Sequence, residues 1–109
     1  MKKRIPKFQE CMRLMHKRDP QMQEDGFHLL LSQAHDYTQQ LIEEFVQETD
    51  PGLRCWLLEL LVETRNSDAL PLFLQHLHSK ETDLRVIAIR GLKQLDTKEA
   101  RRALWEAGI

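Results

Sequence analysis

The histidines are the first candidates in this chain for a catalytic or metal site, and their spacing shows which of them could act together. His76 and His78 are two residues apart in a segment with helical periodicity, so they point in different directions, and no cysteine or carboxylate stands at a recognised zinc spacing. His28 and His35 are seven apart and could share one helix face. For both pairs we favour exposed or hydrogen-bonded structural histidines over metal ligands or general bases.

The two cysteines, Cys11 and Cys55, are too few and too far apart for a disulfide framework or a zinc knuckle. Cys11 and His16 are five apart, which does not place them on one helix face as a nucleophile and its base. The sequence contains no phosphate-binding glycine loop, no Gly-x-Ser-x-Gly and no His-Glu-x-x-His. We therefore expect reduced thiols, no catalytic residue, no metal and no cofactor.

The elements that position these residues follow from an internal repeat. A shift of 31 residues brings Asp19-Pro20 onto Asp50-Pro51 and Leu53-Arg54 onto Leu84-Arg85. A fixed period of this size is typical of stacked supersecondary units, none of which can bury its apolar face alone. The repeat predicts a short helical solenoid, a class of fold that usually binds rather than catalyses.

Each unit is predicted to be a helix, a tight turn and a second helix. In the middle unit, Asp50 caps a first helix of about 51–64 that opens with Pro51, and Ser67 caps a second helix that ends near His78. In the first unit, Asp36 is the expected cap of the second helix. In the last unit, Asp96 and the glutamate three residues later form a candidate capping box.

The resulting fold class is all-α: a right-handed α-solenoid of about seven helices in a single domain over residues 1–109. Three helix pairs occupy residues 19–49, 50–80 and 81–109, and one leading helix lies within 7–18. Positions that recur with the repeat are predicted to form the interior layers. Three of these layers are Gly26, Leu57 and Ala88; Leu30, Leu61 and Leu92; and Leu41, Leu72 and Ala103.

Two segments, TDPGLR at 49–54 and ETDLRVIAIRGL at 81–92, carry a resemblance to a known family. They resemble the inter-repeat turn and first helix of HEAT repeats, in particular the short bacterial type also seen in phycobilisome lyases. The resemblance spans residues 19–109 and is weaker in the first unit, where Gln23 stands in the place of Arg54 and Arg85.

The HEAT resemblance implies roles for four residues. Asp50, Arg54, Asp83 and Arg85 are implied to be scaffold residues that tie neighbouring repeats together, not a catalytic set. For the chain as a whole, the resemblance implies a protein-binding scaffold, with nucleic-acid binding or a lyase subunit as less common roles of such arrays.

Charge is unevenly distributed, although the net charge is only −1. Residues 1–18 carry seven Lys and Arg and one acid, whereas residues 19–50 carry eight acids and no Lys or Arg. The opposite blocks could simply neutralise each other on a solvated surface, or they could form a recognition surface. Nucleic acid is a poor match, because positive charge is concentrated only at the N-terminus instead of forming a continuous basic stripe.

The resemblance also implies that the second helices line the concave side of the stack, where their polar residues would meet a partner. The groove would change from acidic to basic along the stack and suit a protein with a mixed or basic surface. The predicted contact residues are Glu43, Glu44, Gln47, Gln75, His78, Arg101 and Arg102.

The sequence therefore predicts a non-catalytic protein-binding module or adaptor. A second hypothesis is an immunity or inhibitor protein that masks a basic toxin or nuclease, with Glu43, Glu44 and Glu48 imitating phosphates. A third is an accessory subunit of a lyase-type enzyme, and a fourth is a nucleic-acid binder that uses the basic N-terminus.

The chain ends on an apolar segment that contains Leu104, Trp105 and Ile109. We expect it to fold back onto Leu74; the alternative is a contact with a partner or with a second copy in a homo-oligomer. No apolar run approaches the length of a membrane span, and the basic start is not followed by an apolar signal core. The expected location is therefore the cytoplasm, with no membrane partner.

Overall fold

The computed structural model describes residues 7–109, and within them every regular element is helical. Seven α-helices confirm the predicted all-α class over this part of the chain. The elements are α1 (Phe8–Met15), α2 (Pro20–Leu31), α3 (Thr38–Gln47), α4 (Pro51–Thr64), α5 (Leu70–His76), α6 (Thr82–Leu95) and α7 (Lys98–Glu106), with short 3₁₀ turns η1 (Ala34–Tyr37) and η2 (Ser67–Ala69).

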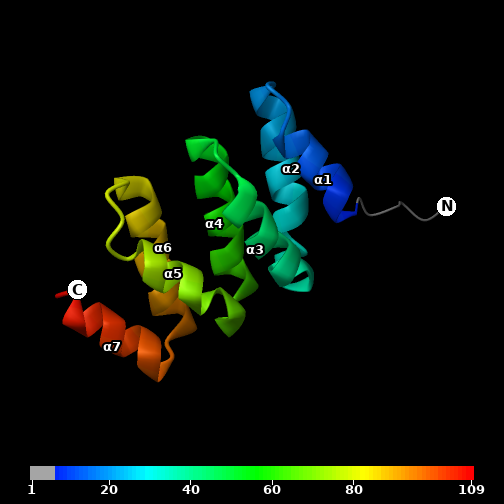
Figure 1. Ribbon diagram of the computed structural model, residues 1–109. Helices are drawn as coiled ribbons and strands as arrows, with labels where there is room; N and C mark the ends of the chain where they lie inside the picture. The colour runs from blue at the N-terminus through cyan, green and yellow to red at the C-terminus, as the bar shows by residue number, and fades with distance from the viewer. Residues whose placement is uncertain (1–6) are drawn as a thin grey trace.

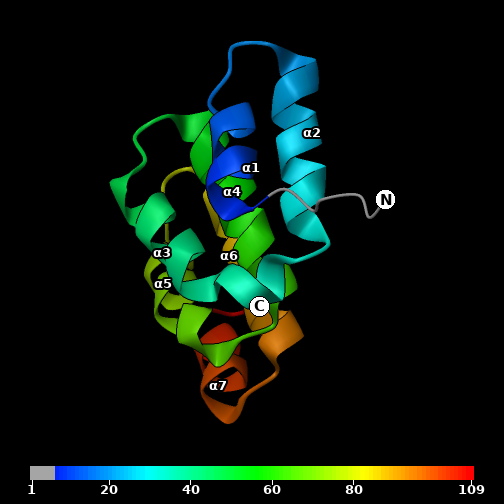
Figure 2. The same ribbon diagram turned by 90° about the vertical axis from the view of Figure 1, so that its right-hand side faces the viewer.

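The helices form an elongated stack of 51 × 28 × 19 Å, as a solenoid requires. Helices α2, α4 and α6 follow one another in one layer, and α3 and α5 lie in front of them in the other (Figures 1 and 2). Helix α1 packs along α2 at one end of the stack, and α7 packs on α6 and α5 at the other. Helix α4 contacts both α2 and α6, while α3 lies on α4 and α5 lies on α6. Contacts between successive units therefore hold the layers together.

The repeated Asp-Pro pair starts the first helix of two units, as predicted. The Asp19 carboxylate accepts hydrogen bonds from the backbone N–H groups of Gln21 and Met22, and the Asp50 carboxylate accepts one from Leu53. Each proline stands in the first turn, where the missing N–H removes no helical hydrogen bond. Helix α4 has the predicted bounds.

The starts of the second helices differ from the prediction. Asp36 and Ser67 are not caps, because each lies inside a 3₁₀ turn that precedes its α-helix. The cap of η2 is Asn66, whose side chain accepts the N–H of Asp68. Helix α5 consequently starts two residues later than a cap at Ser67 would give, and it ends at His76, so that His78 lies beyond it.

The predicted capping box at the start of α7 is also wrong. Asp96 adopts a left-handed backbone with φ of 49° and ends α6, so it cannot also cap the next helix. Thr97 takes that role, and its hydroxyl accepts the N–H of Ala100.

The core follows the predicted layers, except that Ala103 is only half-buried beside the buried Leu41 and Leu72. Leu30, Leu61 and Leu92 are fully buried, as are Leu57 and Ala88. The partner of these last two in the first unit, Gly26, is buried where α1 crosses α2.

Gly26 shows why a small residue is needed at this crossing. A Cβ atom there would lie 2.6 Å from the carbonyl oxygen of Cys11 and 2.9 Å from the Cβ of Leu14. The absence of a side chain thus lets α1 approach the first unit closely enough to cover it.

Candidate functional site

The turns between units are held by an arginine on the first helix of the following unit. The Arg54 guanidinium donates from Nη1 to the carbonyl oxygens of Glu48, at 3.0 Å, and Phe45, at 3.5 Å. The Arg85 Nη1 donates to the carbonyl oxygen of Ser79 at 2.8 Å. Since Ser79 is 31 residues after Glu48, the two arginines make the same contact in successive units. These contacts agree with the scaffold role that the resemblance implied for Arg54 and Arg85.

Arg54 also contacts two rings in the interior. Its guanidinium carbon lies 4.3 Å from the centroid of the Phe45 ring, and Nη2 lies 3.3 Å from Nε2 of His76. The Nδ1 atom of His76 lies 2.9 Å from the carbonyl oxygen of Leu72, which requires Nδ1 to carry the proton and leaves Nε2 to accept from Arg54. His76 is only 8% exposed, and its imidazole packs edge-on against the Phe45 ring, at a centroid separation of 5.2 Å, so that it joins α5 to α3 and to Arg54 of α4.

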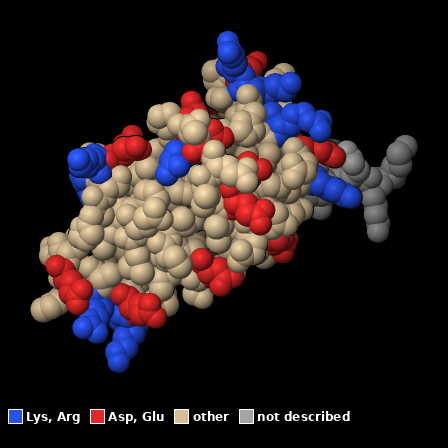
Figure 3. All heavy atoms as spheres, viewed as in Figure 1, with Lys and Arg blue, Asp and Glu red and all other residues tan. Residues whose placement is uncertain are grey.

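The predicted contact residues lie along the exposed side of the second helices and the segments that follow them. Figure 3 views this side, with a broad uncharged area, scattered acids, and basic groups mostly toward the ends. Two of the residues are occupied locally: Arg101 pairs with Asp96 at 3.1 Å and Arg102 with Glu106 at 3.0 Å. The positions are Glu43, Glu44 and Gln47 on α3, Gln75 on α5, His78 after α5, and Arg101 and Arg102 on α7.

This arrangement is a face rather than a pocket, and those residues line none of the hollows beside α4. That these residues bind a partner stays a prediction.

Glu48 belongs to the scaffold and is a poor phosphate mimic. One of its carboxylate oxygens accepts the N–H groups of Thr49 and Asp50, at 3.1 and 3.0 Å. The other lies 3.7 Å from Nε2 of His16, and the side chain is 14% exposed. The carboxylate shapes the turn between α3 and α4, which leaves Glu43 and Glu44 as the acids of this group available to a partner.

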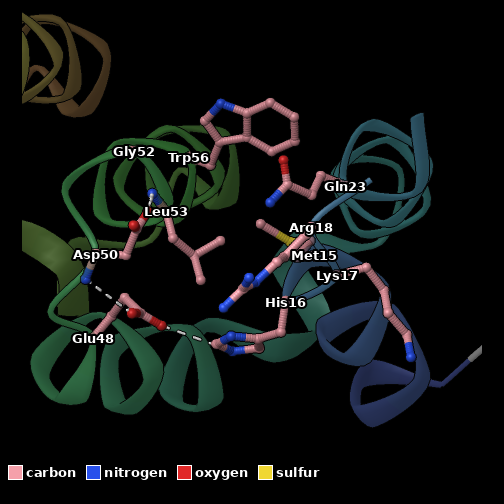
Figure 4. Close-up of a pocket in the computed structure, with 10 residues that line it drawn as sticks. All are labelled: Met15, His16, Lys17, Arg18, Gln23, Glu48, Asp50, Gly52, Leu53 and Trp56. Atoms are coloured by element: carbon pink, nitrogen blue, oxygen red, sulfur yellow. Dashed lines mark hydrogen bonds and ion pairs between the residues drawn. The ribbon is translucent and has the colours of Figure 1, made fainter. Parts of the chain in front are cut away.

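A hollow of about 320 Å³ lies between the α1–α2 turn and the start of α4 (Figure 4). Arg18 extends into it, and Leu53 and Trp56 face it from α4. Gln23 also lines the hollow, in the register that holds Arg54 and Arg85 in the later units. The first unit therefore opens at the position where the later units are held by an arginine.

Further hollows follow the layer of first helices on both sides of α4. One of about 480 Å³ lies between α2 and α4, and one of about 310 Å³ lies between α4 and α6. Trp56 and Glu59 line both of these hollows, and Glu59 also lines a third one of about 280 Å³. We call this region the Trp56 surface, defined by Phe27, Trp56, Glu59, Glu63, Asp83, Val86 and Arg90.

Sequence reasoning did not assign a function to the Trp56 surface. The available signal was that Trp56 occupies the register of Asp25 and Ile87, so that one unit carries a large aromatic side chain where the others do not. The structure shows Trp56 half-buried, with its ring edge-on to that of Phe27 at a centroid separation of 4.8 Å.

Cys11 lies in α1 and Cys55 in α4, and neither forms a disulfide. Burial, with a smaller contribution from Glu10, raises the pKa of the Cys11 thiol. Burial, followed by the charges of Asp83, Glu81 and Glu59, raises the pKa of Cys55. A raised pKa reduces the thiolate fraction and makes both sulfurs poor nucleophiles. No cluster of three or more metal-ligating side chains occurs within residues 7–109.

The apolar C-terminal segment does not fold back as expected. Leu104 is buried, but Trp105 is 80% exposed and Ile109 is 51% exposed. Trp105 points away from the stack because Ala100 and Leu104 form the buried face of α7. The expected packing onto Leu74 is therefore wrong for Trp105, and the alternative of a contact with a partner or a second copy stays a prediction.

This protein belongs to the α-helical repeat class. Its helices stack with a 31-residue register, and arginine side chains hold the turns between successive units. A comparison with protein families matches residues 38–108, from the first residue of α3 to just beyond α7, to HEAT repeats. The chain belongs to the HEAT-repeat family. Searches of curated proteins and of solved structures found no match. Among residues 7–109, no helix is long and apolar enough to cross a membrane.

Proposed function

We propose that this chain is a non-catalytic protein-binding module that docks a partner on an exposed face of its helical stack. HEAT repeats generally act as protein-interaction scaffolds, which supports this class of function. The proposal rests on one observation: some polar groups are used in contacts that hold the fold together, and others are left exposed to solvent. The polar groups at the turns are consumed by caps and arginine contacts, while Glu43, Gln47 and Gln75 on the second helices are exposed.

We further propose that Glu43, Glu44, Gln47 and Gln75 form the central part of the contact surface. Glu43 and Glu44 stand beside each other on α3, with no cation within ion-pair distance among the described residues. Two adjacent unpaired carboxylates favour a partner that presents Lys or Arg, because complementary charge speeds the encounter and selects against acidic partners. His78, Arg101 and Arg102 extend this face toward the C-terminal end.

The test is charge reversal on α3. Glu43→Lys with Glu44→Lys is expected to abolish capture of the protein partner from an extract, while circular dichroism and the unfolding midpoint stay within experimental error of the parent. The matched control is Asp25→Lys with Glu99→Lys, which reverses the same number of charges on α2 and α7, outside both α3 and the Trp56 surface. Equal capture by the parent and the α3 variant would show that this face is not the contact surface.

A further inference from the structure

We propose that the Trp56 surface is a docking site for a segment of a partner protein that carries basic side chains and an apolar side chain as its anchor. This inference rests on the proposed function, since it adds a surface and a partner chemistry to the same protein-binding role. The site lies on the layer of first helices, away from the second-helix face that carries Glu43 and Glu44.

The shape of the surface suits an inserted chain segment. Helix α4 forms a ridge, and the hollows on its two sides meet at Trp56 and Glu59. The half-buried indole is held by its contact with Phe27 and is accessible from both sides, and Val86 beside it is 55% exposed. A held, accessible tryptophan is a preferred anchor in protein interfaces, because it adds large contact area with little loss of conformational freedom.

The charges of the surface select a basic guest. Glu24, Glu59, Glu63 and Asp83 line the hollows, against the single basic side chain of Arg90. Glu59 is paired with Arg90 at 3.2 Å, and Glu24 lies 3.6 Å from Nε2 of His28.

Glu63 and Asp83 are the acids that a guest could pair with directly. Among the described residues neither has a cation within ion-pair distance. Glu63 lies on α4 and Asp83 on α6, and each lines a hollow that Glu59 also lines. Lys or Arg side chains of the guest would pair with them, and a guanidinium could stack on the indole of Trp56. An aliphatic side chain would fill the hollow beside Val86.

The test uses a fluorescently labelled, end-blocked dodecapeptide of alternating arginine and leucine, with a glutamate-for-arginine peptide as the reference. Anisotropy at low salt is expected to show saturable binding of the basic peptide and none of the acidic one. Glu63→Gln with Asp83→Asn is expected to weaken binding about fivefold, and Trp56→Ala about tenfold. The matched pair Asp25→Asn with Glu99→Gln removes the same charge outside both proposed surfaces and should change the affinity less than about twofold.

Equal weakening by the two charge-neutralised pairs would overturn the proposal, as would equal binding of the acidic peptide. If Trp56→Ala lowers the unfolding midpoint, the charge pairs still decide, since Glu63, Asp83, Asp25 and Glu99 are all exposed and none caps a helix.

Capture from an extract separates the two proposals. A partner lost with Glu43→Lys and Glu44→Lys but kept with Glu63→Gln and Asp83→Asn overturns the Trp56 site and leaves the protein-binding function standing. A chain that captures no protein while it binds the basic peptide in a Trp56-dependent way overturns the second-helix contact surface and supports the Trp56 site.

Discussion

Replacing Arg54 by methionine tests whether the arginine contacts hold the stack together. Methionine keeps an apolar stem of similar length but removes the donors to Glu48, Phe45 and His76 and the guanidinium over the Phe45 ring. Arg85→Met is the matched control, because Arg85 makes the equivalent carbonyl contact, to Ser79, without the ring contacts.

The expected loss follows from these contacts. Hydrogen bonds from a charged donor contribute about 1.5–3 kcal/mol each at best, and both arginines are only half-buried, so the low end applies. Arg85→Met, which loses one such hydrogen bond, should then cost about 1.5 kcal/mol. Arg54→Met should cost about 2–3 kcal/mol, since it also leaves the buried Nε2 of His76 without a donor and removes the cation–π contact.

Urea unfolding followed by circular dichroism measures the difference between the two variants. The midpoint should fall more for Arg54→Met at an unchanged slope, and a double-mutant cycle with His76→Phe should show coupling of about 1 kcal/mol. Equal losses for Arg54→Met and Arg85→Met, or a coupling near zero, would refute the argument that the interior ring cluster distinguishes the two contacts.

Two further predictions concern packing and thiol chemistry. Gly26→Ala should destabilise the fold by about 1–3 kcal/mol in thermal unfolding, because the new Cβ meets the backbone of α1. The control is Gly52→Ala, where the nearest atom to the new Cβ is 3.5 Å away, and this variant should be neutral or gain up to about 1 kcal/mol. A neutral Gly26→Ala would contradict the close crossing of α1 and α2. Because burial raises the pKa of both thiols, iodoacetamide should alkylate them at neutral pH more slowly than a cysteine in an unfolded peptide. The alkylation rate should increase as the pH rises above the ordinary thiol range. Cys55 should react faster than the fully buried Cys11. Mass spectrometry of the modified chain measures both rates, and fast labelling of Cys11 in the folded protein would be inconsistent with its burial.

The raised pKa values of the two thiols also make the free energy of unfolding depend on pH. A pKa raised in the folded state means that the folded chain holds the proton more tightly, so this contribution is complete below the unfolded thiol pKa and is lost as the pH rises through the folded one. The unfolding midpoint should therefore fall on the alkaline side of the thiol range, and Cys11→Ser with Cys55→Ser should remove that part of the decline.

Local signals determined where several elements begin. The bounds of α4 follow from the Asp50-Pro51 pair and the break at Arg65, because a side-chain cap, a first-turn proline and a helix end act within a few residues. The 31-residue register likewise placed Leu30, Leu61 and Leu92 in the core, since equivalent positions in a stack face the same neighbours. The errors at Ser67 and Asp96 were also local, because adjacent polar residues compete for one capping role.

The sequence by itself thus determined the all-α class, the repeat and its buried layers, since these depend on periodicity along the chain. The tertiary structure decided which polar groups are free. It alone shows that Glu48 is consumed by two backbone N–H groups and that Trp105 is exposed. It also shows that Trp56 lies between hollows on the first-helix layer. Whether a side chain is buried or already hydrogen-bonded depends on neighbours from other helices, and those neighbours are fixed only when the units stack.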